Sequence, residues 1–201
     1  MTGDTSVVLV AGFGAPSRSL TPLRAALQRA GADVRVAPTG LNLDCGEATV
    51  RRLVEHVRGI GRSITLIGHS RGGQLARVIA VRHPELVERL ITVGTPWTIG
   101  PPDRPGVAMG TAMVRGLRRL GVPVMGSIDC AAGECCTDYR RDLTAPLTVR
   151  WVAVWSSRDR VAGEDSRPPT DADVVLDVDA SHLGLVRSEA GVAAIRSALN
   201  L

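Results

Sequence analysis

Short apolar runs alternate with longer amphipathic stretches along this chain of 201 residues. The first run, residues 7–11, is apolar on both faces, as a strand buried inside a parallel sheet should be. It ends at the turn-forming glycines Gly12 and Gly14. Similar runs, rich in β-branched residues, follow at intervals. The pattern predicts strands at residues 7–11, 33–37, 63–67, 90–93, 149–155 and 173–178.

The stretches between these runs carry apolar side chains at helical spacing. In the first of them, Leu23, Ala26 and Leu27 share one face. The pattern predicts helices at residues 21–30, 46–58, 71–82, 107–120 and 188–199. Strands that alternate with helices are typical of βα units around a parallel sheet. We therefore expect an α/β protein with three layers, α/β/α, and a minimal sheet of six mostly parallel strands.

The alternation is interrupted between residues 97 and 147. About 50 residues without regular pattern are too long for a bare loop, so we expect one domain over residues 1–201 in which 97–147 is a lid or insertion. The helix predicted there has an apolar face made of Met109, Met113, Leu117 and Leu120. This face either covers an acyl pocket or packs on the body without a ligand. For the first case, Met109, Met113 and Trp97 are candidate substrate-binding residues.

Charge and hydropathy limit the possible partners. All 24 basic residues are arginine and the net charge is +4, but they occur singly or in pairs rather than in the runs or stripes of nucleic-acid-binding proteins. No apolar stretch approaches the length of a membrane span. The N-terminus lacks a basic segment followed by a long apolar run, so we expect no signal peptide and a cytoplasmic location.

The strongest chemical signal is Gly68-His69-Ser70-Arg71-Gly72. It follows a predicted strand and precedes a predicted helix, which is the context in which G-x-S-x-G presents a nucleophilic serine on a sharp turn. The alternative is a glycine-rich turn of a nucleotide-binding fold. That alternative is disfavoured because the G-x-G-x-x-G spacing and the P-loop lysine are both missing. Ser70 is therefore the candidate nucleophile.

A nucleophilic serine needs a base, and four histidines are available. His56 precedes the serine in a helix, His69 is fixed beside it in the turn, and His83 ends the following helix. The remaining one, His182, comes just after the last predicted strand, at the sheet edge where ligands bind in α/β proteins. We therefore expect His182 to be the base.

The acid that orients this base is expected after the penultimate strand. Asp159 is the carboxylate in the turn Ser156-Ser157-Arg158-Asp159-Arg160, with Glu164 and Asp165 as substitutes further on. An oxyanion would be held by backbone N–H groups after the nucleophile and after the first strand, which are those of Arg71 and Phe13. Glycines on either side of Phe13 allow a substrate to approach the backbone closely.

These segments together resemble the α/β-hydrolase superfamily, and within it the small bacterial lipases and esterases. The matching segments occur in family order over nearly the whole chain: Val10-Ala11-Gly12-Phe13-Gly14, Gly68-His69-Ser70-Arg71-Gly72-Gly73, Val93-Gly94-Thr95-Pro96, Ser157-Arg158-Asp159-Arg160-Val161 and Ser181-His182. Two departures are visible. Ala11 stands where the family usually has His, and the first two strands of larger members are missing.

The resemblance implies cleavage of a small, apolar ester or acyl substrate through an acyl-enzyme, with no cofactor and no metal in the site. Ser70, His182 and Asp159 would form the catalytic triad. Two other functions remain possible. The same triad could serve a thioesterase, acyltransferase or cyclase in a biosynthetic pathway, or the fold could belong to a non-catalytic binding protein. The sequence does not indicate the oligomeric state.

Four cysteines are present, and three of them, Cys130, Cys135 and Cys136, lie close together within the insertion. Cys130 could form a disulfide with Cys135 or Cys136, the thiols could be reduced and buried, or they could bind zinc. Three clustered thiols with no nearby histidine are one ligand short of a structural zinc site. The sequence leaves all three alternatives open.

Overall fold

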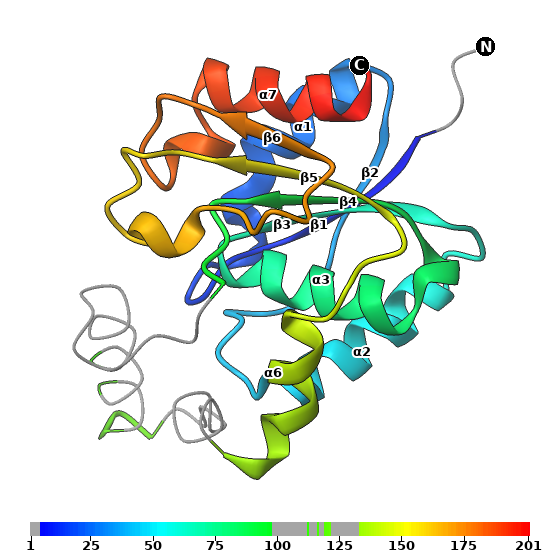
Figure 1. Ribbon diagram of the computed structural model, residues 1–201, viewed down its shortest axis with the longest axis vertical. Helices are drawn as coiled ribbons and strands as arrows, with labels where there is room; N and C mark the ends of the chain where they lie inside the picture. The colour runs from blue at the N-terminus through cyan, green and yellow to red at the C-terminus, as the bar shows by residue number, and fades with distance from the viewer. Residues whose placement is uncertain (1–4, 98–111, 113–115, 117–118, 122–132) are drawn as a thin grey trace.

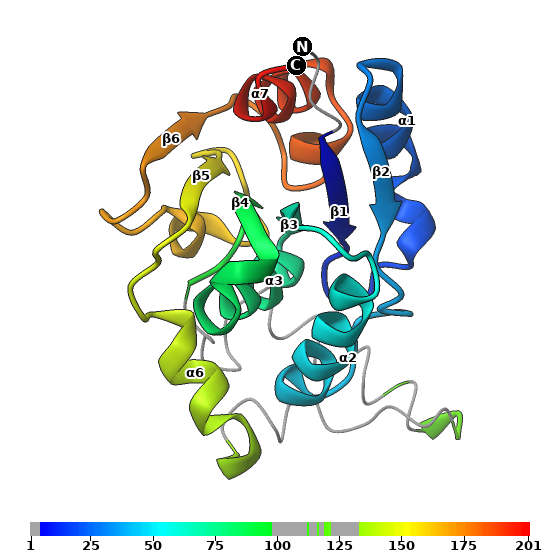
Figure 2. The ribbon, with the colours of Figure 1, turned by 90° about the vertical axis from the view of Figure 1, so that its right-hand side faces the viewer.

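The structure is a computed structural model and describes residues 5–97, 112, 116, 119–121 and 133–201. Among these residues, six parallel strands form a single sheet. From one edge to the other the strands are β2 (Asp33–Val36), β1 (Ser6–Val10), β3 (Ile64–His69), β4 (Val87–Val93), β5 (Arg150–Trp155) and β6 (Val174–Asp177). Figure 2 shows the twist of this sheet from β2 to β6.

Helices cover both faces of the sheet (Figure 1). The helices on one face are α1 (Thr21–Arg29) and α7 (Glu189–Leu199), and those on the other are α2 (Gly46–Arg58), α3 (Arg71–Arg82) and α6 (Thr137–Leu143), which packs on α2 and α3. Short 3-10 helices occur at Ser17–Leu20, Pro84–Leu86, Glu134–Cys136, Gly163–Ser166 and Gly184–Val186. The three layers are those expected from the alternation of apolar runs and amphipathic stretches.

Two apolar cores fill the spaces between the layers. One lies under α2, α3 and α6 and includes Leu75, Ile79 and Trp151, while the other lies under α1 and α7 and includes Leu23 and Ile195. All of these side chains are buried. Burial of a leucine or isoleucine contributes about 2 kcal/mol relative to exposure, so the two cores hold the sheet rigidly between its helices.

The predicted strands and most of the predicted helices are found, and none of their ends is shifted by more than three residues. The sequence missed α6, and β4 begins at Val87 rather than at residue 90. The helix predicted at 107–120 falls almost wholly outside the described residues, and Leu120 at its end is exposed. Among the described residues, no helix has the length and apolar character needed to cross a membrane.

All six strands run the same way, so their carboxyl ends meet at one edge of the sheet. The turns that follow β1, β3, β4, β5 and β6 therefore converge there. These turns carry Gly12, Ser70, Gly94, Asp159 and His182. In open α/β sheets this is the edge at which ligands bind.

Candidate active site

Ser70 occupies a tight turn between the end of β3 and the start of α3. Its backbone has φ 54° and ψ −128°, a region that costs a residue with a Cβ atom free energy and that persists where surrounding contacts enforce it. One such contact is the Ser70 N–H, which donates to the Val93 carbonyl at 2.8 Å. The turn therefore projects the serine out of the regular backbone and links it to the end of β4.

Glycines make this turn possible because backbone atoms occupy the space of their missing side chains. A Cβ atom at Gly68 would lie 2.3 Å from the Gly72 carbonyl oxygen, and one at Gly72 would lie 2.2 Å from the Val10 carbonyl oxygen. At Gly73 it would lie 1.9 Å from the Thr95 hydroxyl. The G-x-S-x-G-G pattern thus reflects close packing of α3 on β1 and β3.

Asp159 and His182 come together from the turns after β5 and β6. Asp159 Oδ2 lies 2.6 Å from His182 Nδ1, and the two residues are only 2% and 8% exposed. Because a carboxylate accepts, Nδ1–H of His182 is the donor, and Nε2 remains as the basic ring nitrogen. The other carboxylate oxygen accepts N–H groups from Val161 at 2.8 Å and Ala162 at 2.9 Å.

These contacts keep Asp159 charged although it is buried. Burial by itself would raise the pKa of this carboxyl group. The hydrogen bond and charge of His182, followed by the N–H groups of Ala162 and Val161, outweigh burial and hold its pKa below the usual value. Asp159 therefore stays an anion. Its negative charge can orient His182 and stabilise the imidazolium form of that ring.

Gly94 joins the serine turn to this pair. It follows Val93, the acceptor for Ser70, and has φ 53°. A Cβ atom there would lie 3.2 Å from Asp159 Oδ2 and 3.4 Å from His182 Nδ1. The backbone at Gly94 thus packs directly against the aspartate–histidine pair, which brings the pair and Ser70 to the same part of the edge.

His69, which the sequence excluded as the base, supports the histidine instead. Its ring centroid lies 4.6 Å from that of His182, and its Nε2–H donates to the His182 carbonyl at 3.0 Å. Burial, and then the charge of a protonated His182, lower the pKa of His69 to about 3. His69 is therefore a neutral, buried donor that fixes the backbone of His182.

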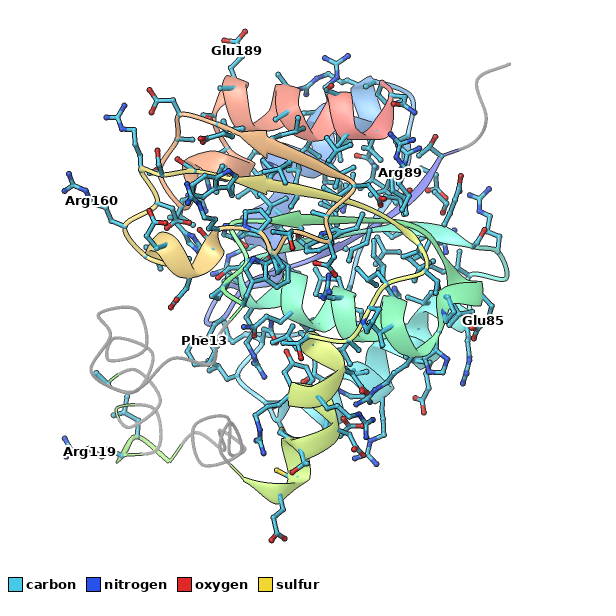
Figure 3. The ribbon with its side chains drawn as sticks, in the orientation of Figure 1. Phe13, Glu85, Arg89, Arg119, Arg160 and Glu189 are labelled. Atoms are coloured by element: carbon cyan, nitrogen blue, oxygen red, sulfur yellow. The ribbon has the colours of Figure 1, made fainter. Side chains whose placement is uncertain are left out.

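The loop after β1 lies against the serine from the other side. A Cβ atom at Gly12 would be 3.1 Å from the Ser70 Cβ, so the loop backbone passes close to Ser70. Figure 3 shows Phe13 on this loop, at the end of the molecule where the strands terminate. Asn42 Nδ2 donates to the Ala11 carbonyl at 2.7 Å and so fixes the start of the loop.

The Arg71 side chain contacts the loop between β2 and α2. Its guanidinium donates to the backbone carbonyls of Asn42 and Asp44 and to Asn42 Oδ1, and it lies 5.7 Å from the Phe13 ring centroid. Burial lowers the pKa of Arg71. The residue after the serine therefore anchors the loop between β2 and α2 through its side chain, while its backbone N–H begins α3.

Sequence reasoning missed Asn42, which is buried and joins the Ala11 carbonyl to the Arg71 guanidinium. Asn42 has φ 50°, a conformation that asparagine tolerates better than most residues. The sequence signal, Gly40-Leu41-Asn42 after a strand, indicates a turn but not what its side chain contacts.

The candidate substrate-binding residues are only partly described. Met109 and Met113 lie outside the described residues. Trp97 packs edge-on against Trp151 with ring centroids 5.2 Å apart, and the Arg77 guanidinium lies 5.6 Å from its ring. Trp97 is half-buried beside the core under α3, and its role toward a substrate stays a prediction.

Side chains able to hold a metal gather, among the described residues, at Cys45, Cys135 and Cys136. This cluster brings in Cys45, which the sequence had left apart from the other cysteines. Cys130 lies outside the described residues, so the possible disulfide between Cys130 and Cys135 or Cys136 stays one of the open alternatives. The Asp159–His182 pair is not part of this cluster.

Comparisons with known proteins agree with this architecture. The chain matches the family model described as the alpha/beta hydrolase fold over residues 58–118, which include the serine turn. A search of curated proteins finds no match to the chain.

Similar solved structures cover almost the whole chain at low identity. Polyneuridine aldehyde esterase is 16% identical over 97% of this chain and 99% of its own, with a TM-score of 0.63. The monoacylglycerol lipase of Paleococcus ferrophilus is 14% identical over 97% and 92%, with a TM-score of 0.68. An alpha/beta hydrolase from the metagenome of lagoon sediments at Mar Chica, Morocco, is 18% identical over 98% and 89%, with a TM-score of 0.66.

These likenesses establish the fold: the chain has the α/β-hydrolase fold, as its motifs indicated. Membership of the lipase and esterase group stays a prediction. The sheet of six parallel strands between helices is the three-layer arrangement that was expected. The assignment of residues 97–147 as a lid stays a prediction.

Proposed function

We propose that the protein is a serine hydrolase that cleaves carboxylic esters through Ser70, His182 and Asp159. The observation that carries this proposal is the buried 2.6 Å hydrogen bond between His182 Nδ1 and Asp159 Oδ2. It lies at the same edge of the sheet as a serine in the φ 54° conformation. A buried aspartate that holds one histidine nitrogen, and so reserves the other for a serine, is the arrangement that nucleophilic catalysis by serine requires.

In the proposed reaction Ser70 Oγ attacks the ester carbonyl while its proton passes to His182 Nε2. The carbonyl oxygen becomes an oxyanion that accepts the N–H groups of Phe13 and Arg71. When this tetrahedral intermediate collapses, the bond to the alcohol breaks and the alcohol leaves with the proton from His182. The acyl group remains bound to Ser70. Water then attacks the acyl group with His182 again as base, which releases the acid and restores the serine.

The start of α3 supports this chemistry electrostatically. The first N–H groups of a helix are not paired within it and carry a partial positive charge. Arg71 begins this helix directly after the serine, so we propose its N–H as one of the two donors to the oxyanion. Loss of one such donor costs hydrolases of this type about 100-fold or more in kcat.

The substrate is proposed to be a small ester with an apolar acyl chain. Three similar structures carry names of an esterase, a monoacylglycerol lipase and lipolytic enzymes. Met109, Met113 and Trp97, from the segment after β4, are proposed to contact the acyl chain, because methionine and tryptophan adapt to apolar ligands. No cofactor takes part in the proposed steps.

Hydrolysis of p-nitrophenyl esters from acetate to palmitate tests the proposal, with wild type and Ser70→Ala assayed side by side. We expect activity in the wild type and a loss of about 1,000-fold or more in Ser70→Ala. The preferred chain length then measures the depth of the acyl site. Equal activity in the two proteins would refute the proposed nucleophile.

The same panel, extended with acyl thioesters and an amine or alcohol acceptor, separates the rival functions. If the protein hydrolyses only thioesters, or transfers the acyl group to the acceptor, the proposed ester substrate is wrong. The proposal that Ser70 is the nucleophile would still hold. A protein that turns over none of these and does not react with a fluorophosphonate would be a binding protein on this fold.

A further inference from the structure

Three cysteines from distant parts of the chain meet on the α2 side of the sheet. Their sulfur atoms all lie within 4.8 Å of one another, with Cys45 Sγ 3.5 Å and Cys135 Sγ 4.0 Å from Cys136 Sγ. Cys45 precedes the first residue of α2, whereas Cys135 and Cys136 end the 3-10 helix that leads into α6. The cluster therefore bridges segments about 90 residues apart.

Two positively polarised groups lie beside the cluster, the start of α2 and the Arg71 guanidinium. Cys45 is the N-cap of α2, a helix of 13 residues whose first turn carries a partial positive charge. The backbone N–H of Glu47, in that turn, donates to the Cys136 sulfur, and the Arg71 guanidinium interacts electrostatically with Cys45 and Cys136. Helix N-termini and nearby arginines are the features that make cysteine sulfur a metal ligand.

The three cysteines differ in their exposure to solvent. Cys136 is buried, Cys45 is half-buried and Cys135 is exposed. A cation can therefore enter from the Cys135 side and be held against the interior.

We propose that Cys45, Cys135 and Cys136 form a thiolate site for a zinc ion that fastens the start of α6 to the start of α2. Zinc–sulfur bonds of about 2.3 Å in a tetrahedral site place sulfurs about 3.8 Å apart, close to the 3.5 and 4.0 Å seen here. A disulfide needs about 2.0 Å between its sulfurs and would use only two of the three.

Charge and protons balance in the binding step. One Zn²⁺ replaces the protons of three thiols, which releases three protons and leaves three thiolates around the ion with a net charge of −1. The Arg71 guanidinium and the start of α2 offset this charge. The fourth position of the tetrahedron is then taken by water or one further ligand.

The site would act on stability rather than on the chemistry at Ser70. A Cβ atom at Gly46 would lie 3.2 Å from the Tyr139 ring, so the first turns of α2 and α6 already pack tightly. The backbone carbonyl of Asp44, next to Cys45 in the chain, accepts a hydrogen bond from the Arg71 guanidinium. An ion held by Cys45 and Cys136 would therefore secure both the entry to α6 and the loop that anchors Arg71.

The test is metal binding by the full chain, purified with a reductant and freed of metal. Titration with Co²⁺ and then Zn²⁺ should give sulfur-to-cobalt charge-transfer absorption, one ion per chain, and release of about three protons per ion. Cys45→Ser and Cys136→Ser should each weaken Zn²⁺ affinity by about 100-fold or more, since even residues that only support ligands cost 10–100-fold.

Glu134→Gln is the matched control, because it removes the charge of an exposed carboxylate next to Cys135 without touching a thiol. Its Zn²⁺ affinity should equal that of wild type. Circular dichroism shows whether each variant folds, without reference to activity. Three results would overturn the proposal. The first two are no charge-transfer absorption in the folded, reduced wild type, and wild-type Zn²⁺ affinity in folded Cys45→Ser. The third is a Cys45–Cys136 disulfide recovered from cells in a protein that binds no Zn²⁺ after reduction.

Discussion

At the scale of single residues, the Asp159–His182 hydrogen bond decides which nitrogen of the histidine is basic. Asp159 Oδ2 takes the hydrogen of His182 Nδ1, while Val161 and Ala162 fix its other oxygen. An amide at position 159 would keep this shape, but it has a donor as well as an acceptor and carries no charge. The chemistry of the pair is therefore separable from its packing.

Asp159→Asn should reduce kcat for ester hydrolysis by about 1,000-fold or more while changing KM little. The asparagine can donate to His182 Nδ1, which moves the histidine hydrogen to Nε2 and leaves no acceptor for the Ser70 proton. Steady-state kinetics measure both constants. Glu164→Gln, at the exposed carboxylate that the sequence offered as a substitute acid, is the control and should keep wild-type kcat. The opposite ranking would make Glu164 the acid.

His69 gives the protein a specific sensitivity to acid. Its pKa is about 3 when folded and 6.5 in its ordinary state, so below pH 6.5 the unfolded chain binds a proton that the folded chain refuses. The contribution of His69 to stability is complete above pH 6.5. It falls by about 1.4 kcal/mol per pH unit as the pH drops toward 3.

His69→Gln should remove that slope, because glutamine keeps an N–H donor for the His182 carbonyl but does not titrate. Urea unfolding of both proteins between pH 7.5 and about 4.5 measures the free energy of unfolding at each pH. We expect the wild-type curve to be steeper than that of the variant by about one proton below pH 6.5. Parallel curves would show that His69 becomes protonated in the folded protein.

The sequence indicated the roles of these residues unequally. Ser70, Asp159 and His182 stand out because each follows a strand at the same edge of the sheet, so their convergence follows from topology. The roles of Asn42 and His69 depend on where a side chain points after the loops have folded. No spacing in the sequence predicts that the side chain of Asn42, in a turn, will donate to the Ala11 carbonyl.

At the scale of elements, the serine turn depends on how closely α3 approaches the sheet. The space that a side chain at Gly72 would need is occupied by the Val10 and Ala11 carbonyl groups. These are backbone atoms of a central strand and of the residue after it, and they cannot move without displacing β1. The turn is therefore a fixed joint between strand and helix.

Gly72→Ala should lower the free energy of unfolding by about 3 kcal/mol, at the upper end of the usual cost of overpacking. Gly59→Ala is the control. Gly59 ends α2 with φ −64°, and the nearest atom to an added Cβ is 3.4 Å away, so its effect should stay within about 1 kcal/mol. Urea midpoints measure both. Equal midpoints for the two variants would mean that α3 can move away from β1.

The elements themselves were largely predictable because the strands are short apolar runs and four of the helices, α1, α2, α3 and α7, have apolar residues at helical spacing. The missed helix, α6, has seven residues, and the side chains it buries include Tyr139 and Leu143. So short a segment with two arginines and two aspartates does not stand out by pattern. Its helical state depends on packing against α2 and α3, which is tertiary information.

At the scale of the whole molecule, Arg77 ties three distant segments together. Its side chain is 1% exposed, donates to the Leu143 and Ala145 carbonyls, and pairs with Asp171 at 2.9 Å. The guanidinium lies 4.2 Å from the Trp151 ring centroid. Arg77 thereby joins α3 to the chain after α6 and to the approach to β6.

Arg77→Met should lower the free energy of unfolding by about 3 kcal/mol, because it leaves one buried and one partly buried carbonyl group without their donor. Asp171→Asn removes the charge of the ion pair at a carboxylate that is 44% exposed and should cost about 1 kcal/mol or less. Thermal unfolding in parallel measures the difference. A larger loss in Asp171→Asn than in Arg77→Met would assign the stabilisation to the ion pair instead of the carbonyl contacts.

Long-range contacts of this kind set the limit of the sequence analysis. The alternation of strands and helices predicts the layers, and the order of the motifs predicts which turns converge. Neither predicts that Arg77 reaches Ala145 or that Cys45 meets Cys136, because these pairs are separated by 68 and 91 residues and follow no period. Such contacts arise from how the described residues 133–147 pack on α2 and α3.

The central claim is that Ser70 is a nucleophile activated by His182. Its most direct test is reaction with a fluorophosphonate probe, followed by identification of the modified peptide by mass spectrometry in wild type and His182→Gln. The account predicts one modification, on Ser70, formed at least about 1,000-fold more slowly in His182→Gln. Modification at another residue, or equal rates on Ser70 in both proteins, would contradict it.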